Sequence, residues 1–321
     1  MCDVHHHYSP LQSDKGNTGK KAPGKGLPGG PDIRRSLDMM ARCNVRRSIL
    51  SYPVWFPGGT GAYERDMCRR VNEAYVGLSA GYPSLGAFAL LPFSNGRYHL
   101  LGEMEHALDI LRLEGVLLPS NLQEICPDRN VLPELYRELD RRRACVFIHP
   151  VFPFGKEDTG QNVHVTMKEV TRAACELVFG RMAELYPGIR FILSYGGGNI
   201  SFFFHRIKSG ALYPDLTGGF GERDLSGVGE LFRRFYYDTA FTIGADMLNC
   251  LKSFVPKTHM LYGSDFPSLA VEQIGQNLEY SRYVRCGNGQ SLLECLQGNS
   301  SIFGNGTEER RGTKRKDKDI E

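Results

Sequence analysis

Short apolar segments, each about as long as one buried β-strand, recur along the chain and alternate with longer segments of helical spacing. The expected strands are Cys2–His7, Ser48–Tyr52, Leu85–Leu91, Gly115–Pro119, Cys145–His149, Arg190–Tyr195, Phe235–Ala240 and Met260–Asp265. The expected helices are Asp32–Asn44, Ala62–Ala80, Glu103–Leu113, Leu132–Arg143, Met167–Tyr186, Asn199–Lys208, Ile243–Phe254 and Leu269–Val284. Eight strand–helix units in strict order predict a closed α/β structure, the (β/α)8 or TIM barrel. An open doubly wound sheet would carry a GxGxxG turn after its first strand, but here that strand ends in histidines.

The length of the chain fits one such barrel. The chain has 321 residues, and a typical barrel of roughly 250 residues leaves room for loops and a tail. We expect residues 1–306 to form a single domain and residues 307–321 to form a charged, disordered tail. Segment 15–31 is rich in Gly, Pro and Lys and is expected to be a flexible loop. Its GxxxxGK stretch is followed by Gly26 instead of Ser or Thr, which argues against a phosphate-binding loop.

Charge and cysteine content argue against several classes of protein. A formal net charge of +3 is too small to predict a nucleic-acid partner. The nine cysteines are scattered without a CxxC pair, which favours reduced thiols in the cytoplasm over a disulfide framework. No segment reaches the ~20 apolar residues of a membrane-spanning helix, and the start of the sequence, MCDVHHHYSP, lacks the apolar core of a secretory signal. We therefore expect a cytoplasmic protein without a membrane partner.

Histidines stand where the first and fifth expected strands end. Side chains alternate between the two faces of a strand, so His5 and His7 should point to one side and His6 to the other. His149 is the first polar residue after an apolar run, and Pro150 ends the strand there. Barrel enzymes hold catalytic groups and metals at the carboxyl ends of their strands. The alternatives are an incidental histidine cluster or, for His149, a hydrogen-bonded histidine of the core.

An aspartate ends the eighth expected strand in the same way. A buried carboxylate at Asp265 would be costly unless it pairs with a cation or accepts hydrogen bonds. It could instead cap the next helix, because Asp is a favoured N-cap residue. Beside three histidines at matching strand ends, a fourth metal ligand is the better interpretation. The expected ligands are therefore His5, His7, His149 and Asp265.

Five segments, in this order, resemble the amidohydrolase superfamily. They are DVHHHYSP, VFIHPVFPFG, RFILSYGGGNISFFFHRI, YYDTAF and MLYGSDFP. The resemblance is closer to the decarboxylase branch, which includes aminocarboxymuconate-semialdehyde, γ-resorcylate and 6-methylsalicylate decarboxylases. It implies a barrel that holds one divalent metal on these four ligands, usually zinc and in some members manganese. Segment Gly115–Pro119, the expected fourth strand, has no Lys or Glu that could bridge a second metal, which fits a single metal ion. Relatives in this family are often dimers, so the resemblance also makes a homodimer one expectation.

One position departs from the pattern of this family. The sixth strand of the family usually ends in a histidine followed by glycines, whereas this sequence has Tyr195 before Gly196, Gly197 and Gly198. An imidazole titrates near pH 6.5 and a phenol near 10. Tyr195 can therefore donate a hydrogen bond but cannot readily shuttle a proton at neutral pH. Both an altered working site and an impaired one are compatible with this exchange.

The resemblance implies a carboxy-lyase that removes CO2 from a small aromatic or enoic carboxylic acid. A bound metal would orient the carboxylate of the substrate, and Asp265 would supply or relay the proton that replaces CO2, with Tyr195 as the second candidate catalytic residue. Aromatic loop residues could stack on a ring and an arginine could pair with the carboxylate. The candidate substrate-binding residues are Trp55, Phe152, Phe154 and Arg206. The alternatives are a metal-dependent hydrolase of a lactone or amide, and a descendant whose activity is impaired.

Overall fold

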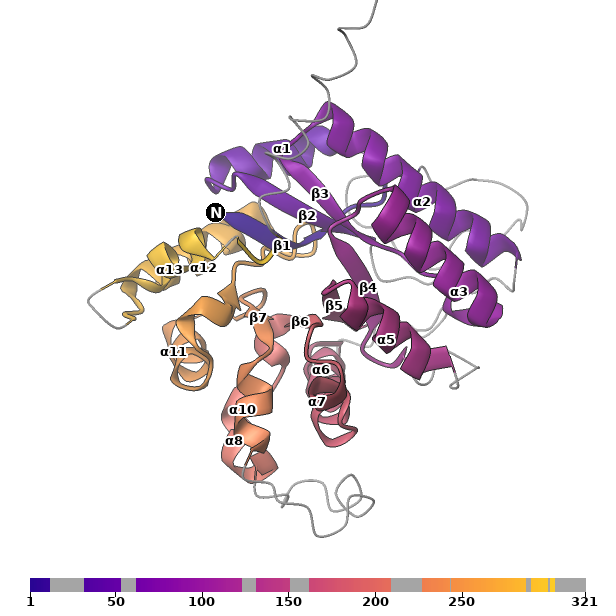
Figure 1. Cartoon of the computed structure of the whole chain (residues 1–321). Helices are drawn as coiled ribbons and strands as arrows, with labels where there is room; N and C mark the ends of the chain where they lie inside the picture. Colours follow the sequence, from indigo (N-terminus) through magenta and orange to yellow (C-terminus); the bar gives the residue numbers. More distant parts are fainter. Residues whose placement is uncertain are drawn as a thin grey trace, which may run out of the picture.

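A closed parallel sheet forms the centre of the computed structural model, which describes residues 1–11, 32–52, 62–122, 131–150, 162–208, 227–242, 244–286, 290–299 and 301–303. Eight strands follow one another around the sheet in chain order (Figure 1). They are β1 (Cys2–His7), β2 (Arg47–Ser51), β3 (Leu85–Ala89), β4 (Gly115–Pro119), β5 (Cys145–His149), β6 (Arg190–Leu193), β7 (Tyr236–Asp238) and β8 (Met260–Leu261). The amides of Val4 and His7 donate to the carbonyls of Tyr262 and Phe266, at 2.9 and 2.7 Å, and close the sheet. The predicted (β/α)8 barrel is confirmed.

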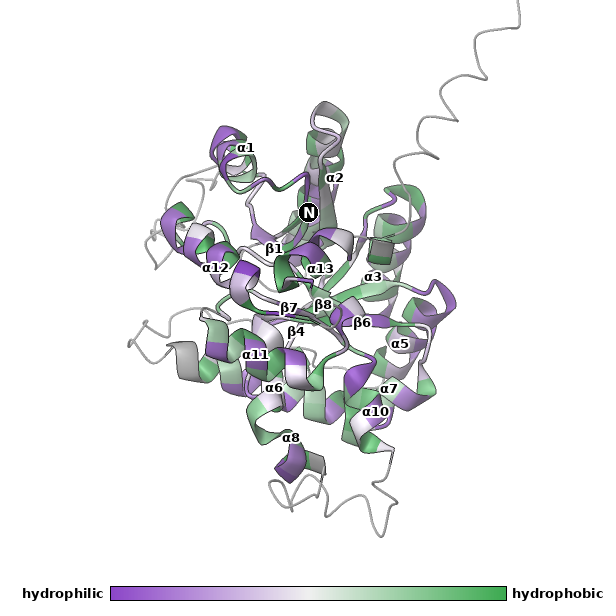
Figure 2. Cartoon of the chain, turned by 90° about the vertical axis from the view of Figure 1, so that its left-hand side faces the viewer, coloured by the Kyte–Doolittle hydropathy of each residue, from purple (hydrophilic) through white to green (hydrophobic). Residues whose placement is uncertain are grey.

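Helices surround the strands. They are α1 (Ile33–Arg42), α2 (Ala62–Gly81), α3 (Gly96–Glu105), α5 (Leu132–Arg141), α6 (Asn162–Phe179), α7 (Met182–Leu185), α8 (Ile200–Lys208), α10 (Val228–Arg233), α11 (Ala245–Phe254), α12 (Val271–Tyr283) and α13 (Leu292–Gly298). Leu135, Tyr136 and Leu139 form the buried stripe of α5, while Arg141 at its end is exposed. Figure 2 shows hydrophobic and hydrophilic residues alternating along the helices, as expected for elements with one buried face.

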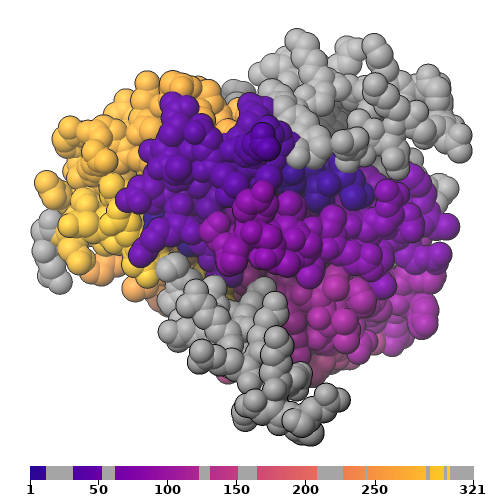
Figure 3. All heavy atoms as spheres, turned by 90° about the horizontal axis from the view of Figure 1, so that it is seen from above, coloured from indigo at the N-terminus to yellow at the C-terminus, as the bar shows by residue number. Residues whose placement is uncertain are grey.

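The first and last elements of the chain lie side by side. In Figure 1, α12 and α13 lie next to β1, and in Figure 3 the yellow C-terminal segments adjoin the indigo and violet N-terminal ones. The β3, β4 and β5 strands are buried along their whole length. Continuous apolar runs are typical of parallel strands that are covered on both faces, which is why the sequence predicted these strands well.

Some boundaries differ from the sequence prediction. The predicted helix Glu103–Leu113 begins earlier than expected, at Gly96, because α3 (Gly96–Glu105) leads into a π-helical turn (His106–Ile110), and it ends at Ile110. The predicted helix Met167–Tyr186 divides into α6 and α7 because Arg181 adopts a left-handed backbone conformation with φ 66°. The eighth strand is shorter than predicted, because beyond Leu261 the chain meets β1 only through isolated bridges. The helices α10 and α13 were not predicted.

Several sequence predictions concern residues outside the described ranges. These are the flexible segment 15–31, the tail 307–321, and the residues Trp55, Phe152 and Phe154. Of the helices that the structure describes, none combines the length and the apolar composition that crossing a membrane requires. The cysteines within the described ranges are free thiols.

Gly115 begins β4 where the backbone of β5 passes close by. A Cβ added at Gly115 would lie 2.2 Å from the carbonyl oxygen of Cys145. We expect Gly115→Ala to lower the free energy of unfolding by about 2 kcal/mol or more, because the backbone must shift to relieve the overlap. Urea unfolding measures this change. In the control Gly102→Ala, on α3, the added Cβ meets nothing within 4 Å and should stabilise the helix by up to ~1 kcal/mol. Equal stabilities of the two variants would contradict the prediction.

Candidate metal centre

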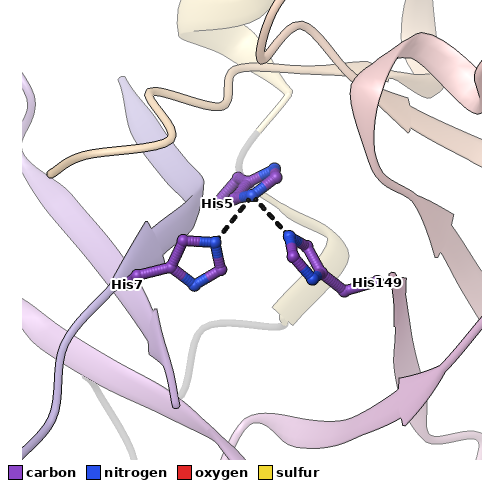
Figure 4. Close-up of side chains that lie close together, drawn as sticks. All are labelled: His5, His7 and His149. Atoms are coloured by element: carbon purple, nitrogen blue, oxygen red, sulfur yellow. Dashed lines mark hydrogen bonds between the residues drawn. The ribbon is translucent and has the colours of Figure 1, made fainter. Parts of the chain in front are cut away.

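Three imidazoles meet inside the barrel at the carboxyl ends of its strands. His5 and His7 come from β1 and His149 ends β5, and all are buried. The Nε2 atom of His5 lies 3.2 Å from that of His7 and 3.1 Å from that of His149 (Figure 4). His6 points the other way, and its Nε2 lies 2.9 Å from Ser36 Oγ on α1. The strand alternation read from the sequence therefore separates His6 from the two histidines that face inward.

Asp265 joins this cluster from the segment after β8. Its Oδ1 lies 3.4 Å from His5 Nε2 and 3.3 Å from His7 Nε2. Neither carboxylate oxygen has a hydrogen-bond partner in the part of the chain that the structure describes. The residue does not cap the following helix, since Ala270 occupies the N-cap position of α12. The alternative of a helix cap is therefore excluded, and a buried carboxylate faces the imidazoles with its oxygens unsatisfied.

The spacing of these donor atoms suits one divalent cation. A tetrahedral ion with bonds of about 2.0–2.1 Å places its ligands roughly 3.3 Å apart. The Nε2 atom of His5 lies 3.1 to 3.4 Å from its three neighbours in the cluster, and His7 Nε2 lies 3.3 Å from Asp265 Oδ1. The nearest nitrogen atoms of His5, His7 and His149 all lie within 4.8 Å of one another. Lone pairs and a carboxylate aimed at one point repel each other unless a cation or a proton lies between them. The cluster can therefore hold a metal ion.

A second layer of groups orients the three rings. His5 Nδ1 lies 2.7 Å from Asp238 Oδ2, and His7 Nδ1 lies 2.9 Å from Ser51 Oγ. His149 Nδ1 lies 2.8 Å from the carbonyl oxygen of Pro150, which can only accept, so this nitrogen carries the proton. Such partners direct the lone pair of Nε2 toward the metal position. Sequence reasoning missed Asp238 and Ser51, although Asp238 ends a buried strand in the way that drew attention to Asp265.

The charges of the metal-free cluster follow from its burial and its carboxylates. Burial alone would lower the pKa of His5, but Asp238 and Asp265 outweigh it and raise that pKa to about 10. Burial lowers the pKa of His7 and of His149. Burial alone would raise the pKa of Asp265, yet His5 and His7 outweigh it and hold the pKa well below its ordinary value. Without metal, a proton on His5 therefore faces two carboxylates.

Tyr195 lies at the edge of the cluster, after β6. Its Oη is 3.0 Å from His149 Nε2, and its ring centroid is 4.9 Å from that of His5. Its backbone φ of 54° lies in the left-handed region, and its amide donates to Asp238 Oδ1 at 2.9 Å. Burial, together with Asp265 and Asp238, raises the pKa of Tyr195 well above 10, so the phenol is neutral and can donate a hydrogen bond.

The predicted substrate-binding residues are not assembled by the described structure. Arg206 lies on α8 with an exposed side chain, whereas the metal cluster is buried. Trp55, Phe152 and Phe154 lie outside the described residues. These four assignments remain predictions.

The profile of the Amidohydrolase family matches residues 2–276. The chain belongs to this family. This amidohydrolase is 29% identical to a 6-methylsalicylic acid decarboxylase of Penicillium expansum over 280 residues, which cover 83% of this chain and 84% of the relative. It is also 29% identical over 303 residues to the 6-methylsalicylic acid decarboxylase acuB of Aspergillus aculeatus, with 88% of each chain covered.

A solved structure shares the fold of this amidohydrolase. It is a dihydroxybenzoic acid decarboxylase from Polaromonas sp. JS666, with bound manganese and the inhibitor 2-nitroresorcinol. The TM-score is 0.73 at 15% sequence identity, with 94% of this chain and 96% of that chain covered. The resemblance inferred from the five sequence segments is confirmed.

With zinc as the probe ion, metal binding to this cluster should tighten as the pH rises. The metal must displace the proton of His5, whose pKa is raised to about 10. Between pH 7 and 9, the apparent association constant should therefore rise about tenfold per pH unit, because ligand atoms must be deprotonated to bind. Competition with a chromophoric chelator measures the constant at each pH. Asp238→Asn removes a carboxylate that raises this pKa, so the slope should flatten; an affinity independent of pH would contradict the prediction.

Proposed function

We propose that this chain is a metal-dependent decarboxylase of a small aromatic carboxylic acid, most like 6-methylsalicylate. The observation that carries the proposal is the convergence of three imidazole nitrogens with the unsatisfied carboxylate of Asp265 at the catalytic end of a barrel. The two relatives reported above are 6-methylsalicylic acid decarboxylases. We also propose that the enzyme is cytoplasmic and that it forms a homodimer.

The metal ligands that we assign are His5, His7, His149 and Asp265. A set of three imidazole nitrogens and one carboxylate oxygen, with His5 Nε2 within 3.4 Å of the other three, favours zinc. Manganese is the second candidate, because the Polaromonas decarboxylase binds it. One ion is proposed, since β4 offers no side chain that could bridge a second. When bound, the metal would act as a Lewis acid for the carboxylate and a neighbouring oxygen of the substrate.

Decarboxylation requires a proton at the carbon from which CO2 departs. The C–C bond breaks, its electron pair stays on the ring carbon, and a proton must form the new C–H bond. Asp265 is the proposed carrier of that proton. Because its pKa is held well below the ordinary value, Asp265 is a carboxylate in the free enzyme. It must therefore first accept a proton, from a substrate hydroxyl or from water, and then transfer it to carbon.

Tyr195 is the proposed hydrogen-bond donor to a substrate oxygen. In the metal-free cluster its hydroxyl lies 3.0 Å from His149 Nε2. A metal on that nitrogen would take up the same lone pair, and the hydroxyl would then need another acceptor. Trp55, Phe152 and Phe154 are proposed to stack on the aromatic ring. Arg206 is proposed to meet a carboxylate, and its exposure makes it the least supported of these assignments.

Metal content and CO2 release test the proposed function together. Purified protein should hold about one equivalent of zinc or manganese per chain and release CO2 from 6-methylsalicylate or a related hydroxybenzoate. His5→Ala should lose both, because it removes the imidazole whose Nε2 lies within 3.4 Å of each of the other three donors. The control His205→Ala changes an exposed imidazole on α8 and should retain both. A protein without metal, or a His5→Ala variant that behaves like wild type, would refute the proposal.

Removal of the phenol hydroxyl tests the role of Tyr195. Tyr195→Phe should keep the metal but lower kcat by about 100-fold, as expected for loss of a positioned acid or hydrogen-bond donor. Metal analysis and steady-state kinetics on the same preparation separate these effects. An unchanged kcat would exclude a catalytic role. If the natural protein shows no turnover and Tyr195→His acquires it, the chain is an impaired descendant of an active decarboxylase.

A further inference from the structure

One buried carboxylate holds two separate parts of the site. Asp238 ends β7, and its side chain is completely buried. Its Oδ2 lies 2.7 Å from His5 Nδ1 on β1. Its Oδ1 accepts hydrogen bonds from the amides of Tyr195, at 2.9 Å, and Ala240, at 3.0 Å. The two oxygens thus bind the first histidine of the cluster on one side and the turn after β6 on the other.

The neighbouring strand leaves room for this arrangement. A Cβ added at Gly263, just after β8, would lie 2.9 Å from His5 Cβ and 3.1 Å from Asp238 Cβ and Cγ. Contacts below about 3.4 Å are tighter than ordinary van der Waals packing. Asp238 can therefore reach from β7 past β8 to β1 because residue 263 has no side chain.

The turn after β6 needs such an acceptor. Tyr195 has a φ of 54°, and the three glycines that follow also have positive φ values of 62°, 75° and 68°. A left-handed conformation is unfavourable for a tyrosine, and it persists only where surrounding contacts fix it. The hydrogen bond from the amide of Tyr195 to Asp238 is one such contact, and it fixes the point from which the phenol reaches His149 Nε2.

We propose that Asp238 is a positioning residue that fixes the tautomer of His5, a proposed metal ligand, and the position of the Tyr195 phenol. Through Oδ2 it keeps a proton on His5 Nδ1, which leaves the Nε2 lone pair for the metal. Through Oδ1 it holds Tyr195 where its hydroxyl meets the cluster. The first part of this role rests on the proposed metal-dependent function, whereas the second does not.

An isosteric amide cannot replace this carboxylate. If the amide oxygen of Asp238→Asn faces Tyr195 and Ala240, its NH2 group points at His5 Nδ1, which must then accept and leave the proton on Nε2. If the side chain is reversed, the NH2 group faces two backbone donors, and the turn loses its acceptor. Either orientation therefore breaks one half of the arrangement.

Two measurements on the full chain of Asp238→Asn test the proposal: zinc affinity by chelator competition, and hydrogen exchange of the Tyr195 amide by NMR. At least one must change, zinc affinity falling by about 10- to 100-fold or amide exchange accelerating by about tenfold through loss of a hydrogen bond. The control is Asp140→Asn on α5. Asp140 also accepts a hydrogen bond from a backbone amide, that of Gly188 at 2.6 Å, but it is not part of the cluster, so the substitution should change neither measurement.

The results separate this proposal from the proposed function. Wild-type affinity and wild-type exchange together in Asp238→Asn would overturn the role of Asp238, while metal binding and CO2 release by the wild type would still stand. If the wild type itself binds neither zinc nor manganese, the proposed function fails. The exchange of the Tyr195 amide then still decides whether Asp238 holds the turn: an unchanged rate in Asp238→Asn overturns the proposal, and an accelerated rate supports its second part.

Discussion

The closure of the barrel and the assembly of its metal cluster depend on the same seam between β8 and β1. Asp3 is fully buried there and accepts hydrogen bonds from the amide and hydroxyl of Ser264, at 3.0 and 2.6 Å, and from the amide of His5, at 3.1 Å. The amide of Asp265 in turn donates to the carbonyl of His5 at 2.8 Å. Because β8 has only two residues, these polar contacts join the segments that carry His5, His7 and Asp265.

Burial gives this seam its chemistry. Charged groups in a barrel interior lose their hydration, and they are tolerated only where they pair. Asp238 and Asp265 both meet this requirement through His5, at 2.7 and 3.4 Å. A divalent cation at the same point would satisfy Asp265 and the three Nε2 lone pairs at once, while the bond between His5 and Asp238 could remain. In this arrangement, one metal ion can replace the proton that His5 carries on Nε2.

Sequence reasoning identified the four side chains that the structure brings together because strand ends follow a simple rule: a polar residue after an apolar parallel strand lies at the rim of the barrel. The same rule applies to Asp238, but its partners are the imidazole of His5 on β1 and the backbone amide of Tyr195 after β6. Both partners are distant in the sequence, and no repeating pattern of residues indicates such contacts. The bounds of β4 and β5 were predicted correctly because each is a continuous buried run, GVLLP in β4 and CVFI followed by His149 in β5. β8 was predicted too long because Tyr262 and Phe266 contact β1 outside a regular strand.

The phenol at position 195 limits how a proton can move through the site. An imidazole there could both take up and release a proton near neutral pH, whereas the buried phenol of Tyr195, with its pKa raised well above 10, keeps its proton and acts only through hydrogen bonds. Under the proposed mechanism, proton transfer to carbon would then use Asp265, which begins as a carboxylate because its pKa is held well below the ordinary value. Under the proposed mechanism, a hydroxyl next to the carboxylate of the substrate would give its proton to Asp265, and the phenolate left on the product would take a second proton from water. The proposed function would therefore be served best by a hydroxybenzoate, because its hydroxyl can supply the proton that Tyr195 keeps.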